Sequence, residues 1–109
     1  GRLINIPPSL LPAFPGLDTH QRAIDTGCRA AGCTVHFVTP ELDSGPIISQ
    51  GVVPVLDDDT ADTLAARVLA AEHILLPQAV ADFAAGRLQT GGNRVHNGRA
   101  ADPQARLLL

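Results

Sequence analysis

The sequence has no lysine, methionine, tryptophan or tyrosine, and its only aromatic residues are three phenylalanines. All eight basic side chains are therefore arginines, which excludes catalysis through a lysine Schiff base. With so few rings, the chain offers no platform on which nucleic-acid bases would stack. The formal net charge is −3, whereas proteins that bind nucleic acid or an anionic membrane surface usually carry an excess of positive charge.

Cysteine is also scarce. Cys28 and Cys33 are too few for a four-cysteine zinc site or for the disulfide framework of a small secreted domain. We therefore expect two reduced thiols in a cytoplasmic protein. The four histidines include no pair at i, i+4 spacing, so no metal is predicted. No run approaches the roughly 20 apolar residues that span a bilayer.

What remains is typical of a globular α/β domain: 109 residues, 45% of them apolar and 17% charged. The chain starts at Gly1 directly before an apolar run, so we expect a piece of a longer protein. The connection between the two central strands is short, which predicts that they are antiparallel. The first expected elements are the end of a strand at 3–6, an irregular loop with four prolines at 7–16 and a helix that ends at Thr26. Two strands follow at 34–39 and 47–55, the second of them interrupted at Gly51. A helix from about Asp57 to Ala85, kinked or split at Pro77, then leads to a hairpin from Leu88 and a loose tail over the last ten residues.

Four polar residues lie where chemistry can occur, and each has a plain structural alternative. Asn5 ends an apolar strand, where α/β sheets bind ligands, or it only caps that strand. Asp43 lies in a turn-rich loop that can approach Asn5, or it is an ordinary turn aspartate. His36 is a catalyst or a half-buried strand residue. Glu72, in a stretch rich in alanine and leucine, is by pattern alone a surface residue.

Several longer strings carry a family resemblance. They are residues 5–12 (NIPPSLLP), 15–20 (PGLDTH), 36–48 (HFVTPELDSGPII), 72–73 (EH) and 83–88 (FAAGRL). Together they resemble the C-terminal half of the glycinamide ribonucleotide formyltransferase family, from Leu3 to about Leu88. Formyl-folate hydrolases and methionyl-tRNA formyltransferases share parts of the first and third strings, whereas the second and fourth favour the purine enzyme.

The resemblance implies a mixed β-sheet flanked by helices. Residues 1–90 would be the C-terminal part of a formyltransferase domain and residues 91–109 a hairpin and loose tail. The N-terminal nucleotide-binding half would be missing, so we expect this chain to be inactive alone and to need that half as its partner. The implied activity is formyl transfer from 10-formyltetrahydrofolate to the amine of glycinamide ribonucleotide in purine biosynthesis, with no metal, nucleic acid or membrane involved.

The family's site residues carry over position by position. Asn5 corresponds to the asparagine that donates to the developing oxyanion. Asp43 corresponds to the aspartate that holds a histidine protonated and orders a water. Pro7 occupies the position of that histidine, and a proline side chain cannot move a proton. The resemblance assigns the folate to Asn5, Thr39, Pro40, Glu41, Leu42 and Asp43, and the nucleotide to Leu69, Ala70, Ala71 and Glu72.

Two alternatives remain open. One is a formyltetrahydrofolate hydrolase, and the other is a non-catalytic folate-binding pseudoenzyme that lost turnover with the change at Pro7. His20 and His36 resemble family histidines near the site, but the sequence does not show that either replaces the missing one. The residues preceding this chain would discriminate: a phosphate-binding loop favours the transferase or pseudoenzyme, and a regulatory module favours the hydrolase.

Overall fold

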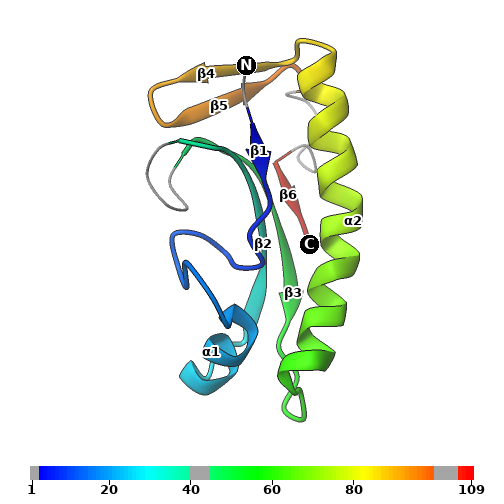
Figure 1. The fold of residues 1–109 in the computed structure, drawn as a ribbon. Helices are drawn as coiled ribbons and strands as arrows, with labels where there is room; N and C mark the ends of the chain where they lie inside the picture. Colours follow the sequence, from blue (N-terminus) through cyan, green and yellow to red (C-terminus); the bar gives the residue numbers. More distant parts are fainter. Residues whose placement is uncertain (1–2, 40–44, 100–105) are drawn as a thin grey trace.

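In the computed structural model, one long helix covers a face of a curled β-sheet, and the proline-rich loop lies against the other face (Figure 1). The structure describes residues 3–39, 45–99 and 106–109. Its elements are β1 (Ile4–Asn5), α1 (Thr19–Thr26), β2 (Ala30–Phe37), β3 (Ile47–Pro54), α2 (Ala61–Ala84), β4 (Leu88–Gly91), β5 (Arg94–Asn97) and β6 (Leu107–Leu108). The sheet order is β1-β2-β3-β5-β4, and β6 also pairs with β3. The predicted α/β class is confirmed.

The central pair, β2 and β3, is antiparallel as predicted, and its register runs from Ala30 opposite Pro54 to His36 opposite Ile47. The predicted interruption at Gly51 is wrong, because Gly51 lies inside β3. A Cβ atom there would come within 2.9 Å of Leu75 Cδ1 and 3.2 Å of Ala71 Cβ. The glycine therefore lets α2 pack closely on an unbroken strand.

Helix α2 is continuous from Ala61 to Ala84, so it is not split at Pro77 as one of the two predicted outcomes required. The helix begins with a capping box, in which Thr60 Oγ1 accepts the Thr63 N–H and Thr63 Oγ1 accepts the Thr60 N–H. Pro77 is exposed, while Leu75 and Ala79 on either side of it are buried against the sheet. This packing holds the helix together across the one backbone bond that proline removes.

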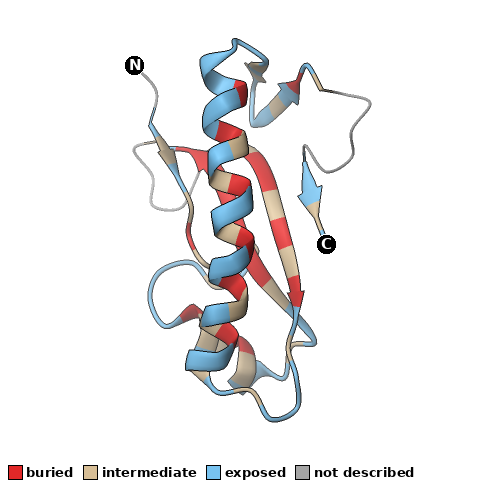
Figure 2. Ribbon diagram, turned by 90° about the vertical axis from the view of Figure 1, so that its right-hand side faces the viewer, coloured by how far each residue is buried: buried red, intermediate tan, exposed pale blue. Residues whose placement is uncertain are grey.

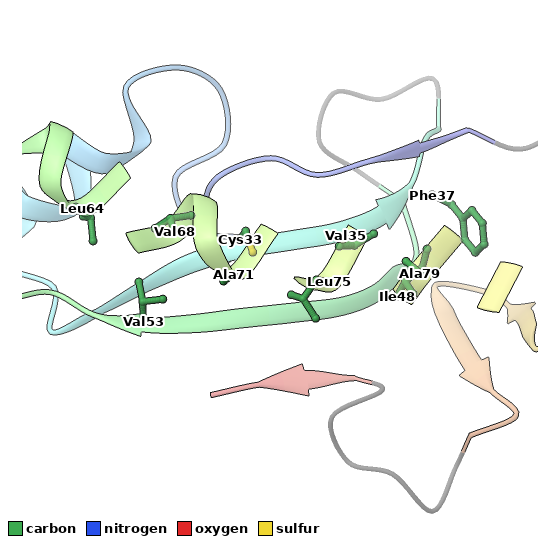
Figure 3. Close-up of a cluster of buried hydrophobic side chains, with 10 residues drawn as sticks. All are labelled: Cys33, Val35, Phe37, Ile48, Val53, Leu64, Val68, Ala71, Leu75 and Ala79. Atoms are coloured by element: carbon green, nitrogen blue, oxygen red, sulfur yellow. The ribbon is translucent and has the colours of Figure 1, made fainter. Parts of the chain in front are cut away.

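The core lies between α2 and the two central strands. Figure 2 shows the buried stripe of α2 turned toward β2 and β3. Phe37 ends the core beside Phe83, with ring centroids 5.8 Å apart in an edge-to-face contact. The buried side chains in Figure 3 are Cys33, Val35 and Phe37 of β2, Ile48 and Val53 of β3, and Leu64, Val68, Ala71, Leu75 and Ala79 of α2.

By length and composition, α2 would also suit a membrane span, with a mean hydropathy of 1.3. The sequence predicted no such segment, because no run approaches roughly 20 apolar residues. The apolar stripe of α2 is instead accounted for by its packing on β2 and β3, since the core helix of a globular domain satisfies the same criteria.

The C-terminal segment adds two features to the sheet. A hairpin is present from Leu88, with β4 and β5 joined at Gly92, whose φ of 61° favours glycine. Leu107–Leu108 pairs with β3 at Gln50 and Gly51, where a loose tail was expected. Leu108 packs against the core, which explains why this end returns to the sheet. The division of the chain into a formyltransferase part at 1–90 and a hairpin and tail at 91–109 stays a prediction.

Asp82, buried near the end of α2, joins the hairpin to the helix. Its carboxylate accepts hydrogen bonds from Asn97 Nδ2 (3.0 Å), Arg99 Nη2 (2.7 Å) and Arg87 Nη1 (3.1 Å). Burial by itself would raise the pKa of Asp82, but these hydrogen bonds outweigh it and lower the pKa below its ordinary value. The ionised carboxylate is therefore the form that holds the hairpin.

We expect Asp82 to make the fold sensitive to acid. Its folded pKa lies below the unfolded value of about 3.9, so its contribution is complete above that value and is lost as the pH falls through the folded pKa. Asp82→Asn should lower the free energy of unfolding at neutral pH by about 2 kcal/mol. Melting temperatures should then fall less steeply between about pH 5 and pH 2 than in the parent. Asp58→Asn, at an exposed aspartate, is the control, and equal slopes for all three proteins would contradict the prediction.

Candidate functional site

The hydroxyl of Thr34 is the centre of the contacts that hold the proline-rich loop. Thr34 Oγ1 donates to the Ser9 carbonyl oxygen at 2.7 Å, and it accepts from the Leu11 N–H and from Gln50 Nε2, each at 3.0 Å. One donor and two acceptor positions are thus all used. Gln50 Nε2 also donates to the Leu11 carbonyl oxygen at 3.0 Å. The central strands therefore fix the loop that follows Asn5.

Helix α1 holds the same loop from its other side. Thr19 Oγ1 donates to the Pro8 carbonyl oxygen at 2.7 Å. Arg22 Nη1 donates to the carbonyl oxygens of Pro15 (2.7 Å) and Leu17 (3.0 Å), and its guanidinium lies 5.5 Å from the centre of the Phe14 ring. Asp18 takes the cap position of α1, but its side chain makes no capping bond. The loop is irregular yet extensively bonded.

Asn5 lies at the exposed end of β1, directly opposite His36 of β2. Its Oδ1 accepts the Ile6 N–H at 2.9 Å, which fixes the orientation of the amide. Within the described part of the chain, Nδ2 makes no hydrogen bond, so it remains available as a donor. Oδ1 thus partly fulfils the structural role that was the alternative for Asn5, which is to cap the strand, while Nδ2 can still contact a ligand.

His36 is 2% exposed, and its two ring nitrogens have different surroundings. Nδ1 lies 2.8 Å from the Phe37 carbonyl oxygen, so this nitrogen carries a hydrogen and donates it. Nε2 is buried, and within residues 3–39, 45–99 and 106–109 it has no hydrogen-bond partner. A buried polar atom without a partner is unfavourable by about 1–3 kcal/mol, which favours a partner supplied by a ligand or by another part of a larger protein.

His20 lies elsewhere. It lines an apolar cavity of about 120 Å³ between the proline-rich loop, α1 and the start of β2, together with Phe14 and Gly32. Burial lowers its pKa. Because His36 is four residues beyond Gly32 along β2, roughly 13 Å further, the two histidines are at different ends of the strand. The structure therefore brings His36, and not His20, next to Asn5.

Pro7 continues the register of β1. The Thr34 N–H donates to its carbonyl oxygen at 3.1 Å, two residues along from the Asn5–His36 pair on both strands. Residues two apart in an extended segment point to the same face, so Pro7 and Asn5 share one side of the sheet. Pro7 is buried there.

The nucleotide residues implied by the resemblance lie on α2, which covers the opposite face. Leu69 and Ala70 are exposed, Glu72 is half-buried, and Ala71 is turned toward Gly51 in the core. Burial raises the pKa of Glu72, with a smaller opposing effect from His73. Thr39 is half-buried after the end of β2, whereas Pro40, Glu41, Leu42 and Asp43 lie outside the described residues.

No group of three or more potential metal ligands is found within residues 3–39, 45–99 and 106–109.

The sequence did not reveal the role of Thr34 and Gln50, which were predicted only as strand residues. A single polar position in each strand gave no signal that both side chains meet the proline-rich loop.

Comparison with known proteins gives this geometry its context. A family profile described as "Formyl transferase" matches residues 1–80. The chain belongs to the formyl transferase family. This confirms at the level of the family the resemblance drawn from the sequence strings, and it places the Asn5 strand and the proline-rich loop inside the matched region.

Formyl transferases of purine biosynthesis are prominent among the similar proteins. The chain is 48% identical over 105 residues to phosphoribosylglycinamide formyltransferase of Escherichia coli, covering 95% of this chain and 50% of that one. A solved phosphoribosylglycinamide formyltransferase from Anaplasma phagocytophilum has a TM-score of 0.88 at 45% identity, covering 96% of this chain and 50% of the other. A formyltetrahydrofolate deformylase from Pseudomonas syringae has a TM-score of 0.83 at 33% identity, covering 86% and 32%. The chain thus spans about half the length of the curated formyl transferase it matches.

Proposed function

We propose that this chain supplies the C-terminal half of an enzyme that transfers a formyl group from 10-formyltetrahydrofolate to the amine of glycinamide ribonucleotide. The observation that carries the proposal is the exposed Asn5 amide at the end of β1, where Oδ1 is held by the Ile6 N–H and Nδ2 makes no hydrogen bond within the described residues. A free amide donor fits the oxygen of a formyl group, which only accepts hydrogen bonds. The 48% identity to the Escherichia coli enzyme supports the same reaction.

Asn5 has the main electrostatic role in this proposal. When bound, 10-formyltetrahydrofolate supplies the formyl carbon that the amine attacks. Asn5 Nδ2 donates to the formyl oxygen as negative charge develops there, a contact worth about 10²–10³ in rate. Its orientation is fixed before the reaction because Oδ1 is held by the Ile6 N–H. A preorganised donor stabilises the transition state without rearrangement.

The remaining assignments follow the resemblance. The folate contacts are Asn5 and the loop from Thr39 to Asp43, and the nucleotide contacts are Leu69, Ala70, Ala71 and Glu72. The half-buried Glu72 carboxylate accepts from hydroxyl groups of the nucleotide. The preceding half of the enzyme is the protein partner, and the enzyme works in the cytoplasm without a metal.

The proposal can be tested in an assembled enzyme, meaning this chain fused behind the residues that precede the match in the Escherichia coli relative. With 10-formyltetrahydrofolate and glycinamide ribonucleotide, we expect formylglycinamide ribonucleotide as the product. The similarity to the Pseudomonas syringae deformylase makes hydrolysis the second candidate. Formate released at the same rate without glycinamide ribonucleotide would support the hydrolase, and folate binding without either product would support the pseudoenzyme.

Asp43→Asn should separate catalysis from binding in the assembled enzyme. The change keeps the shape of the side chain but removes the charge that orders a water, so kcat should fall about tenfold to a hundredfold. The loss is modest because Pro7 stands where the histidine partner of Asp43 is expected. The dissociation constant of a folate analogue, measured by calorimetry, should change little. Asp58→Asn, at an exposed aspartate outside the candidate site, is the charge-matched control, and equal losses of binding and turnover in Asp43→Asn would make Asp43 structural.

A further inference from the structure

The apolar cavity of about 120 Å³ beside α1 is separate from the candidate site. It lies between the proline-rich loop, α1 and the start of β2, and in Figure 1 α1 is at the opposite end of the sheet from the β4–β5 hairpin. Ala23 of α1 is a buried part of its wall, whereas Ala13 and Ala30 are exposed at its rim. Ala30 precedes His36 by six residues of extended strand, roughly 20 Å. The cavity is therefore open to a ligand of its own.

The walls of this cavity are fixed by hydrogen bonds on both sides of the loop. Thr34 Oγ1 in β2 donates to the Ser9 carbonyl oxygen, and Thr19 Oγ1 in α1 donates to the Pro8 carbonyl oxygen, each at 2.7 Å. Ser9, Pro8 and Thr19 all line the cavity. Because the loop is already held in place, a ligand can bind without first ordering it.

Ser9 provides a polar group that has no partner. The residue is 4% exposed, and within the described part of the chain its Oγ is buried without a hydrogen bond. The Ser9 carbonyl oxygen is bound to Thr34, so the hydroxyl is left for a ligand in the cavity that Ser9 lines. A buried hydroxyl without a partner is unfavourable, and a ligand that carries a hydroxyl group can both donate to it and accept from it.

The lining also limits the charge and size of a ligand. Among the described residues, no aspartate, glutamate or arginine lines the cavity, and burial lowers the pKa of His20, which keeps that ring neutral at neutral pH. An uncharged ligand is therefore favoured. A cavity of about 150 Å³ can hold one benzene ring, so this cavity has room for a single small ring. The ring of Phe14 in its wall favours an aromatic ligand.

We propose that this cavity binds a small uncharged phenol, with the ring among the apolar side chains and the hydroxyl group hydrogen-bonded to Ser9 Oγ. A phenolic hydroxyl group has a pKa of about 10 and is uncharged at neutral pH. It donates and accepts, as the serine hydroxyl does. The site goes beyond the proposed function and does not depend on it, because no residue assigned to formyl transfer lines the cavity.

Two probes of similar size test the proposal on the assembled enzyme. They are phenol and toluene, which has a methyl group in place of the hydroxyl, and chemical-shift titrations by NMR give the dissociation constant of each. Ser9→Ala should weaken binding of phenol about threefold to tenfold and leave toluene unchanged. The melting temperature should not fall, because the variant removes a hydroxyl that has no partner. Thr26→Val is the control, since it removes an exposed hydroxyl outside the cavity.

A second variant tests the location of the site. Ala30 is on the same face of β2 as Gly32 and Thr34, which is the face that the loop covers. A larger side chain at the exposed rim covers the opening without entering the core, so Ala30→Ile should weaken binding of both probes at least tenfold.

Three outcomes would overturn the inference: no saturable binding of phenol to the parent, unchanged phenol binding in Ala30→Ile, or equal effects of Ser9→Ala on the two probes. The titrations need neither substrate of the formyl transfer. If the assembled enzyme formed no formylglycinamide ribonucleotide, the proposed function would fail, and the titrations would still decide whether phenol binds beside Ser9.

Discussion

Replacing Pro7 by histidine is expected to raise kcat of the assembled enzyme by about 10²–10⁴, the usual share of general acid–base catalysis. Proton transfer from the attacking amine needs a side chain that Pro7 lacks. Position 7 follows Asn5 by two residues in the same register, so a side chain there shares the face of Asn5. The KM values should change little, because substrate contacts through Asn5 and the following loop remain. Initial rates at saturating concentrations of both substrates measure the effect.

The fold should tolerate this substitution. The contact of Pro7 with β2 is made by its carbonyl oxygen, which any residue retains, and Pro8 still restricts the backbone that follows. Pro7→Ala is the matched control, since it removes the ring without adding an imidazole. If Pro7→Ala gained as much as Pro7→His, the effect would come from the loop backbone. If neither variant exceeded the parent, the shuttle would lie elsewhere, and His36→Asn would be the next variant to measure.

Thr34→Val is expected to lower the free energy of unfolding by about 3 kcal/mol or more. Valine has nearly the same shape, but it leaves the Leu11 N–H and the Ser9 carbonyl oxygen without the partner that the hydroxyl supplies. Thr34 is completely buried, so water cannot replace the hydroxyl without a rearrangement of the loop. Denaturant unfolding of the assembled enzyme, followed by circular dichroism, gives the change in midpoint.

Thr34→Ser distinguishes the hydroxyl from simple packing. It keeps all three hydrogen bonds and removes one methyl group, so it should lower the free energy of unfolding by only about 1 kcal/mol. Turnover should follow the same order, because the loop held by Thr34 immediately follows Asn5. A serine variant as unstable as the valine variant would show that the methyl group, and not the hydroxyl, holds this region.

Much of the local structure was predictable because it depends on neighbouring residues. Gly27 ends α1 with a φ of 83°, a conformation that favours glycine, and the sequence placed the end of that helix correctly. The two central strands and their antiparallel pairing followed from β-branched composition and a short connection. Pro77 was misjudged for the opposite reason: the residues that keep α2 continuous across it are in β2 and β3, far away in the sequence.

The sequence by itself determined the family, through strings of residues long enough to be specific, and it predicted Asn5 and Asp43 as catalytic positions and Pro7 as the departure from the family's histidine. Only the tertiary structure decided that His36, and not His20, lies beside Asn5. The physical reason is register. A pairing between strands is set by how whole strands align and by what packs on each face, and a shift of one residue would turn His36 to the other face of the sheet.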